Sequence, residues 1–225
     1  MRLSILIYDG VTSLDVIGGY EVLARVPGIE TEFVAITRGV IAADTRRLGL
    51  LAYRSFDEVR STDILYVPGG PGGRALETDA HFLEYLRTLD RTSTWTIGIC
   101  NGVTLLAAAG LLKGCKVTTN WFDRERIAQY GAEFVAKRYH IEGKYVTGAG
   151  VSASIDTALF FAKQIANEDL ARAIQLGLEY YPEPPLAAKK PDETPEYIHK
   201  IVRDHAVTEA KILKMRPAFA DAMTR

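Results

Sequence analysis

Cys100 is the side chain best placed for nucleophilic chemistry. It follows the apolar run Trp95–Ile99, which is typical of a buried strand, and precedes a helix that begins near Asn101. Unpaired N–H groups at a helix N-terminus favour thiolate over thiol, and Gly98 and Gly102 permit a tight turn that lifts a nucleophile above a sheet edge. The context predicts a reactive cysteine of low pKa; the alternative is a buried small apolar side chain.

The second cysteine, Cys115, lacks this context. It follows a predicted helix C-terminus and opens the short predicted strand Lys116–Thr118. The two cysteines form neither a disulfide framework nor a CxxC pair, so each is judged as a thiol. We expect Cys115 to be inert.

Two further features follow predicted strands at the same sheet edge. Asp15 begins the first predicted helix, and the loop Val67–Gly73 places four glycines around Pro71. Because the carboxyl ends of parallel strands share one edge, both features are expected near Cys100. A carboxylate beside a thiol can act as a general acid or base, and a glycine-rich loop can aim backbone N–H groups at an anion. The alternatives are an ordinary N-cap aspartate and a flexible turn.

Metal and nucleotide chemistry have little support in the sequence. The four histidines, His81, His140, His199 and His205, have no cysteine or carboxylate partner at metal-ligand spacing. Neither GxGxxG after the first strand nor GxxxxGK[ST] occurs. We therefore expect neither a metal ion nor a nucleotide cofactor.

The elements that position these residues alternate between strands and helices. Short apolar runs bounded by Gly, Pro or polar turns alternate with helical periodicity, the pattern of a parallel sheet covered by helices. The expected strands are Leu3–Tyr8, Glu32–Thr37, Asp63–Val67 and Trp95–Ile99, and the expected helices are Asp15–Val26, His81–Asp90, Trp121–Tyr130, Ser154–Ala166 and Asn167–Tyr180. Gly39–Tyr53 is expected to be an antiparallel excursion, and Phe134–Thr147 a hairpin turning at Glu142-Gly143.

One domain boundary is visible, at the proline cluster Pro182–Pro185. We expect a single domain over residues 1–185, followed by a linker and an amphipathic helix in residues 186–225. That helix, Pro195–Lys214, has Ile198, Ile201, Val202, Ile212 and Leu213 on one side. Because such a segment cannot close a core alone, we expect it to be an arm of a dimer.

Composition excludes several classes of protein. The 225 residues are 48% hydrophobic and 24% charged, which is typical of a globular protein. The 27 basic and 28 acidic residues leave a formal charge of -1, which provides no electrostatic footprint for nucleic acid or an anionic membrane. No apolar run is long enough to span a bilayer and no cleavable leader is visible, so we expect a cytoplasmic protein.

A series of short motifs occurs in order along the chain. They are Leu14-Asp15-Val16-Ile17-Gly18, Val67-Pro68-Gly69-Gly70, Ile99-Cys100-Asn101-Gly102, Ala107-Ala108-Ala109-Gly110-Leu111-Leu112, Thr118-Thr119-Asn120-Trp121, and Thr147-Gly148-Ala149-Gly150 with Ile155-Asp156. In this series the sequence resembles the DJ-1/PfpI superfamily, and most closely its isocyanide hydratase branch, over about residues 2 to 185.

The resemblance implies a flavodoxin-like α/β sandwich, whose central, mostly parallel sheet has helices on both faces, and a homodimer. It implies a nucleophile at Cys100 and a partner acid at Asp15, where many members have glutamate. It also implies that the backbone amides of Gly70 and Asn101 face the negative charge that develops in the reaction.

The sequence departs from the family pattern beside the expected pocket. Asn101 stands where protease-like members have histidine and hydratase-type members usually have threonine. Asn120 stands where hydratase-type members have histidine, and Gly19 where that branch commonly has proline. Peptidase or amidotransferase chemistry is therefore disfavoured, and Asn101 and Asn120 are expected to contact the substrate.

The leading hypothesis is a cofactor-independent hydratase that converts an isocyanide and water to an N-substituted formamide through a thioimidate on Cys100. Asp15 would deliver the proton and assist water. The alternatives are a non-enzymatic sensor or redox-responsive dimer, and glyoxalase-type hydration of a small dicarbonyl. The same motifs also occur in the ligand-binding half of AraC-type regulators, in which DNA-binding helices follow that half. Only forty residues follow Pro185 here, so we do not expect DNA binding.

Overall fold

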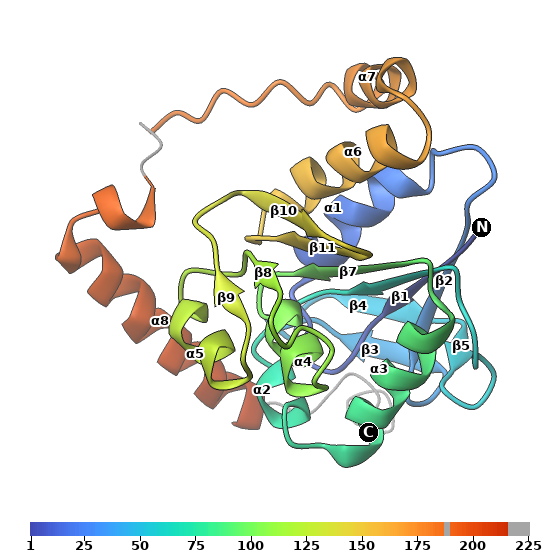
Figure 1. Ribbon diagram of the computed structural model, residues 1–225. Coiled ribbons are helices and arrows are strands. Elements are labelled where there is room, and N and C mark those ends of the chain that lie inside the picture. The colour runs from blue at the N-terminus through green and yellow to red at the C-terminus, as the bar shows by residue number, and fades with distance from the viewer. Residues whose placement is uncertain (187–189, 216–225) are drawn as a thin grey trace.

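A seven-stranded sheet forms the centre of the protein (Figure 1). The computed structural model describes residues 1–186 and 190–215. The strands are, in spatial order, β10 (Tyr139–Glu142), β11 (Tyr145–Gly148), β7 (Trp95–Ile99), β6 (Ile64–Val67), β1 (Arg2–Leu6), β2 (Glu30–Ala35) and β5 (Arg54–Ser55). All neighbouring strands run parallel except the edge pair β10 and β11.

The strand order explains where a site can form. Taken in chain order, β2-β1-β6-β7-β11 is the 2-1-3-4-5 order of flavodoxin-like folds, which confirms the predicted fold class. The chain leaves β1 towards β2 and later returns to β6 on the other side of β1. In such sheets ligands bind at this reversal, outside the carboxyl ends of the strands.

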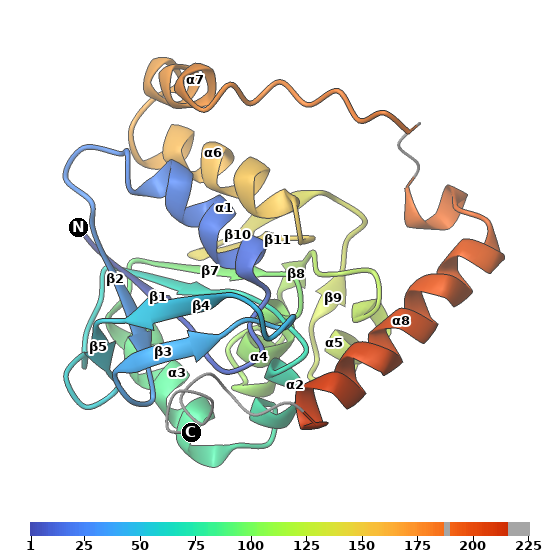
Figure 2. The same cartoon turned by 180° about the vertical axis from the view of Figure 1, so that it is seen from behind.

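Helices cover both faces of the sheet (Figures 1 and 2). On one face α1 (Ser13–Leu23) packs against α6 (Ala153–Ile165), and α7 (Glu168–Gly177) packs on α6. On the other face lie α3 (Ala80–Thr92) and α4 (Gly102–Ala108), with α2 (Gly73–Leu76) and α5 (Arg124–Gln129) beyond α4.

Helix α3 shows why these segments are helical. Its N-cap Asp79 accepts a hydrogen bond of 3.0 Å from the N–H of Phe82. Phe82, Leu86 and Leu89 recur at helical spacing and are fully buried against the sheet. This amphipathic pattern was recognisable in the sequence, and the expected helix is confirmed with slightly wider bounds.

Two small sheets lie beside the central one. β3 (Gly39–Ala42) and β4 (Gly49–Ala52) pair antiparallel, which confirms the expected excursion. β8 (Lys116–Val117) and β9 (Glu133–Phe134) pair parallel. The second hairpin is therefore confined to β10 and β11, and including Phe134 in it was wrong, because that residue pairs with β8 instead.

Other predicted bounds are also corrected. β1 ends at Leu6 instead of Tyr8, and α5 begins at Arg124 instead of Trp121. The helix after Cys100 was expected from its sequence to continue to Lys113-Gly114, but it ends as α4 at Ala108. The short helix α2 begins at Gly73, the last residue of the glycine loop, and those glycines concealed it in the sequence.

The C-terminal segment follows α7 as an extended chain through the proline cluster. It continues after residue 190 with the 3-10 turn η1 (Pro191–Glu193) and α8 (Glu196–Met215), which lies beside α5 in both views (Figures 1 and 2). The expected helix is confirmed, although the side chains of Ile212 and Leu213 fall outside the described part. Among the described residues, none of the helices has the length and apolar character needed to cross a membrane.

Candidate active site

Cys100 occupies a sharp turn between β7 and α4. Its backbone has φ of 56°, in the left-handed region that side chains other than glycine rarely adopt. Its N–H donates to the carbonyl oxygen of Gly148 at 3.0 Å, and its carbonyl accepts from Thr119 Oγ1 at 2.7 Å. Gly150 packs so closely against the turn that a Cβ on it would lie only 2.4 Å from Cys100 Cβ. These contacts fix the direction in which the thiol points.

The Cys100 thiol is surrounded by polar groups although the residue is only 7% exposed. Asn120 Nδ2 donates to Sγ at 3.3 Å, and the backbone N–H of Asn101 lies close enough to the sulfur to lower the pKa of the thiol. The carboxyl of Asp15 lies close enough to the thiol for the two groups to shift each other's pKa. The sulfur therefore has two N–H donors and one acid as neighbours, which is the set of groups that thiol chemistry requires.

The low pKa expected for this thiol is wrong. Burial raises the pKa of Cys100 well above its ordinary value, and the neighbouring Asp15 carboxylate raises it further. The Asn101 N–H and the Asn120 amide act in the opposite direction without overcoming burial. α4 has only 7 residues and begins after Asn101, so it supplies less helix dipole than a long helix starting at the thiol. In the free protein the Cys100 thiol therefore keeps its proton.

Asp15 is fully buried beneath the thiol, in the first turn of α1. The N-cap of α1 is Thr12, so the alternative of an ordinary N-cap aspartate is wrong. Asp15 Oδ2 accepts from the N–H of Gly69 at 2.9 Å, whereas Oδ1 is buried without a hydrogen-bond partner. Burial raises the pKa of Asp15 from 3.8 to about 7, against the opposing effect of the Gly69 hydrogen bond and of the nearby Cys100 thiol. A carboxyl with this pKa can both give and take a proton near neutrality.

Gly19 has a structural role in placing Asp15. Tyr66 Oη donates to the carbonyl oxygen of Asp15 at 2.6 Å, and a Cβ on Gly19 would lie 2.2 Å from that hydroxyl oxygen. Gly19 thus makes room for a buried hydroxyl that holds the turn carrying Asp15.

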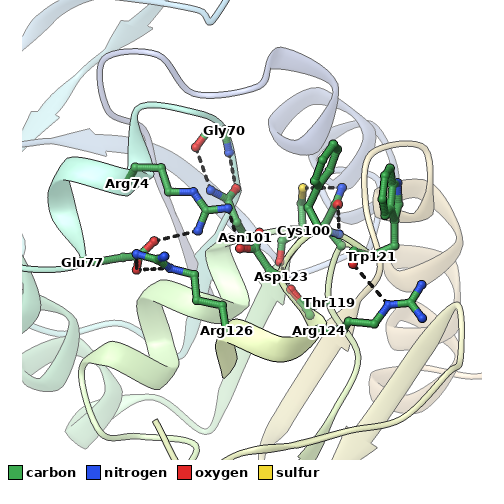
Figure 3. A network of polar contacts seen from close by, with 12 residues as sticks. Gly70, Arg74, Glu77, Cys100, Asn101, Thr119, Trp121, Asp123, Arg124 and Arg126 are labelled. Atoms are coloured by element: carbon green, nitrogen blue, oxygen red, sulfur yellow. Dashed lines mark hydrogen bonds and ion pairs between the residues drawn. The ribbon is translucent and has the colours of Figure 1, made fainter. Parts of the chain in front are cut away.

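Asn101 binds the glycine loop with its side chain (Figure 3). Its Oδ1 accepts from the Gly70 N–H at 2.6 Å, and its Nδ2 donates to the Gly70 carbonyl at 2.9 Å. The Gly70 N–H, expected to face developing negative charge, is thus already engaged. It becomes available to a ligand only if the Asn101 side chain turns away, whereas the backbone N–H of Asn101 already lies against the sulfur.

Cys100 opens onto a cleft of about 1070 Å³. Gly70, Asn101 and Asn120 also line it, while Asp15 is fully buried and does not. The rest of the lining is mainly apolar and includes Ile36, Ile41, Leu76, Phe122 and Val151. A small reactive group can thus meet the thiol while an apolar substituent occupies the cleft.

A charged network borders the same cleft (Figure 3). Arg74 lies 2.5 Å from Asp123 Oδ1 and 3.1 Å from Glu77 Oε1, and Arg126 lies 2.6 Å from Glu77 Oε2. Burial raises the pKa of Asp123, although Arg74 opposes that shift. Sequence reasoning missed this network because Glu77 and Arg126 are 49 residues apart.

The five residues expected at the site, Cys100, Asp15, Gly70, Asn101 and Asn120, lie together in the structure. Cys115 is partly exposed and has no such neighbours; burial and Glu142 raise its pKa. In residues 1–186 and 190–215 no three His, Cys, Asp or Glu side chains are grouped so as to hold a metal ion.

The fold and the site together define a class of protein: a flavodoxin-like sheet with a cysteine at the strand-to-helix turn and a buried acid beneath it. Residues 1–167 match the DJ-1/PfpI family, so the chain belongs to that family.

Known relatives agree with this assignment. The chain is 32% identical to the isonitrile hydratase of Pseudomonas putida over 94% of its own length and 92% of that protein. A ThiJ/PfpI family protein from Pseudomonas syringae has a similar crystal structure, with a TM-score of 0.86 and 28% identity over 94% of this chain and 89% of that one. DJ-1 of Schizosaccharomyces pombe shares the fold, with a TM-score of 0.70 and 19% identity over 81% of this chain and 100% of that one.

Proposed function

We propose that this protein adds water to an isocyanide, R–N≡C, to give an N-substituted formamide. The observation that carries the proposal is the buried Cys100–Asp15 pair, whose thiol lines a largely apolar cleft. The pair supplies a nucleophile for the terminal carbon and an acid whose pKa of about 7 suits proton transfer near neutrality. The similarity to isonitrile hydratase over most of both chains supports the same reaction.

The first step forms a thioimidate. Sγ of Cys100 bonds to the terminal isocyanide carbon while Asp15 gives its proton to that carbon and receives the thiol proton. The product is R–N=CH–S–Cys100, and no atom is lost. This exchange avoids a free thiolate in a site where burial disfavours one.

The second step consumes water. The oxygen of water bonds to the thioimidate carbon, and Asp15 passes one of its protons to the nitrogen. The carbon–sulfur bond then breaks, sulfur takes the electron pair, and the hydroxyl proton returns to it through Asp15. The Asn120 amide, which already donates to Sγ, and the nearby backbone N–H of Asn101 stabilise the departing sulfur.

Formamide production by the purified protein tests the proposal directly. Several isocyanides are incubated with protein whose Cys100 is shown to be reduced, and formamide is quantified by chromatography. Stopped reactions examined by intact mass should show a chain heavier by one isocyanide. If neither formamide nor this adduct forms with any R group, the hydratase proposal fails and the sensor alternative is left.

Replacing Asn101 by threonine is expected to increase kcat/KM for small isocyanides, by up to about 10²-fold if Gly70 then acts as an additional donor. The substitution removes the side chain that engages the Gly70 N–H. Loss of the two hydrogen bonds should also lower the free energy of unfolding by about 1–3 kcal/mol. Steady-state kinetics and urea denaturation measure the two effects. An unchanged kcat/KM would exclude Gly70 as a donor in the reaction.

We also propose that the protein is a homodimer and that the C-terminal segment strengthens it. Tyr197 and Ile201 on α8 are 66% and 60% exposed, so one side of this helix is uncovered in a single chain. Truncation after Pro185 should leave a folded protein whose dimer is weaker and therefore dissociates at a higher protein concentration. Light scattering over a concentration series measures this. A truncated chain with the dimer mass at every concentration would contradict a role for the segment.

A further inference from the structure

Helix α8 reaches the cleft of its own chain. Ala206, near the middle of this helix, lines the cleft together with Phe122 and Asp123, although it lies more than one hundred residues after Cys100 in the sequence. The C-terminal segment therefore supplies part of the wall of the cleft onto which the thiol opens.

Two contacts attach this segment to residues that closely follow Asn120. Asp192 forms an ion pair of 2.6 Å with Arg124, and the ring of His199 lies 4.8 Å from that of Trp121. His199 Nε2 also lies 2.8 Å from the carbonyl oxygen of Pro191, which ties α8 to η1. The attachment points thus adjoin a residue that donates to the Cys100 sulfur.

The geometry of α8 assigns its two sides. His199 and Ala206 are seven residues apart, about two turns, so they lie on one side of the helix. Tyr197 and Ile201 lie on the opposite side, where they are exposed. The described residues between α7 and η1 form no helix or strand, so the contacts of this one side, with the Asp192 ion pair, determine where α8 lies.

We propose that α8 is the outer wall of the substrate cleft in its own chain, and that Ala206 limits the size of the group that can accompany a reactive carbon to Cys100. The inference rests on the proposed function only in treating this cleft as the place where substrate binds. A small side chain at position 206 leaves room that a larger one would fill, so substitution there should discriminate by substrate size.

Thiol labelling tests this without any turnover. In a Cys115→Ala background, Cys100 is labelled with N-methylmaleimide or N-cyclohexylmaleimide, which share one reactive group and differ in bulk. Ala206→Phe should lower the rate ratio of the bulky to the small reagent by about tenfold or more. Val207→Phe is the matched control, because Val207 is 57% exposed on the neighbouring position and should leave the ratio unchanged. Truncation after Pro185 should raise the rate ratio of the bulky to the small reagent.

Two outcomes would overturn the inference. One is an equal ratio in Ala206→Phe and Val207→Phe. If Ala206→Phe is labelled faster by both reagents, it is unfolded, and Ala206→Leu is tested in its place. The other comes from mixing the Ala206→Phe chain with an excess of a chain carrying Cys100→Ala and wild-type Ala206. If that partner restores bulky labelling, α8 serves the partner's cleft instead of its own. Absence of formamide would remove the hydratase proposal and leave these ratios as expected.

Discussion

Replacing Cys100 by alanine is expected to reduce formamide formation to the rate measured in buffer. Every covalent step of the proposed reaction passes through Sγ, and water is too weak a nucleophile to replace the sulfur. Alanine keeps a Cβ at the turn, so the hydrogen bonds of the Cys100 backbone to Gly148 and Thr119 remain and the fold is preserved. Steady-state kinetics with a purified variant measure the effect, and circular dichroism checks the fold.

The matched variant is Cys115→Ala, whose kcat/KM should stay within about twofold of the wild type, because distant surface substitutions rarely change more. Cys115 is partly exposed and none of the site residues contacts it through a hydrogen bond. Turnover that survives in Cys100→Ala, or disappears in Cys115→Ala, would show that the nucleophile has been misassigned. The proposed thioimidate should appear in the mass spectrum of Cys115→Ala and be absent from that of Cys100→Ala.

The sheet was predictable because its strands are short and apolar. β6, with four fully buried residues, and β7, whose bounds were predicted correctly, contain little besides residues that belong in a core. Short elements were less accessible. α2 follows a glycine-rich loop and is held by tertiary contacts that local propensity does not encode, and β9 has only two residues. The equally short β8 was predicted, as Lys116–Thr118.

The positions of the site residues were predictable, but their ionisation was not. Asp15 and Cys100 follow strands of one sheet, so their meeting at one edge follows from topology. The low pKa expected for Cys100 considered the helix N-terminus alone, whereas the depth of burial and the charge of Asp15 decide the direction. The Asn101 side chain on Gly70 was equally inaccessible, because a rotamer choice depends on the surrounding loop.

Asp15→Asn is expected to change activity and stability in opposite directions. It should lower kcat by about 10²–10⁴, the usual contribution of one general acid or base, because asparagine still accepts from the Gly69 N–H but transfers no proton. It should raise the free energy of unfolding by about 4 kcal/mol at pH 7, since the pKa rises from 3.8 to about 7 on folding and each pKa unit corresponds to about 1.4 kcal/mol. Asp15→Glu retains the acid and should retain measurable turnover.

The pH dependence separates these two effects. Below pH 3.8 Asp15 is protonated in both states and the substitution should change little; as pH rises to about 7 the unfolded chain loses this proton first, so the wild type loses stability that Asp15→Asn keeps. Urea denaturation at pH 4 and pH 8 should therefore show a gap between the two proteins that is small at the lower pH and widens to its full size at the higher. In kinetics, wild-type kcat/KM should fall above about pH 7, where Asp15 loses the proton it must deliver, and the residual activity of Asp15→Asn should lack that fall. A wild-type profile that is flat through pH 7, together with a gap in stability that does not grow with pH, would show that Asp15 is ionised in the folded protein and would remove it as the acid.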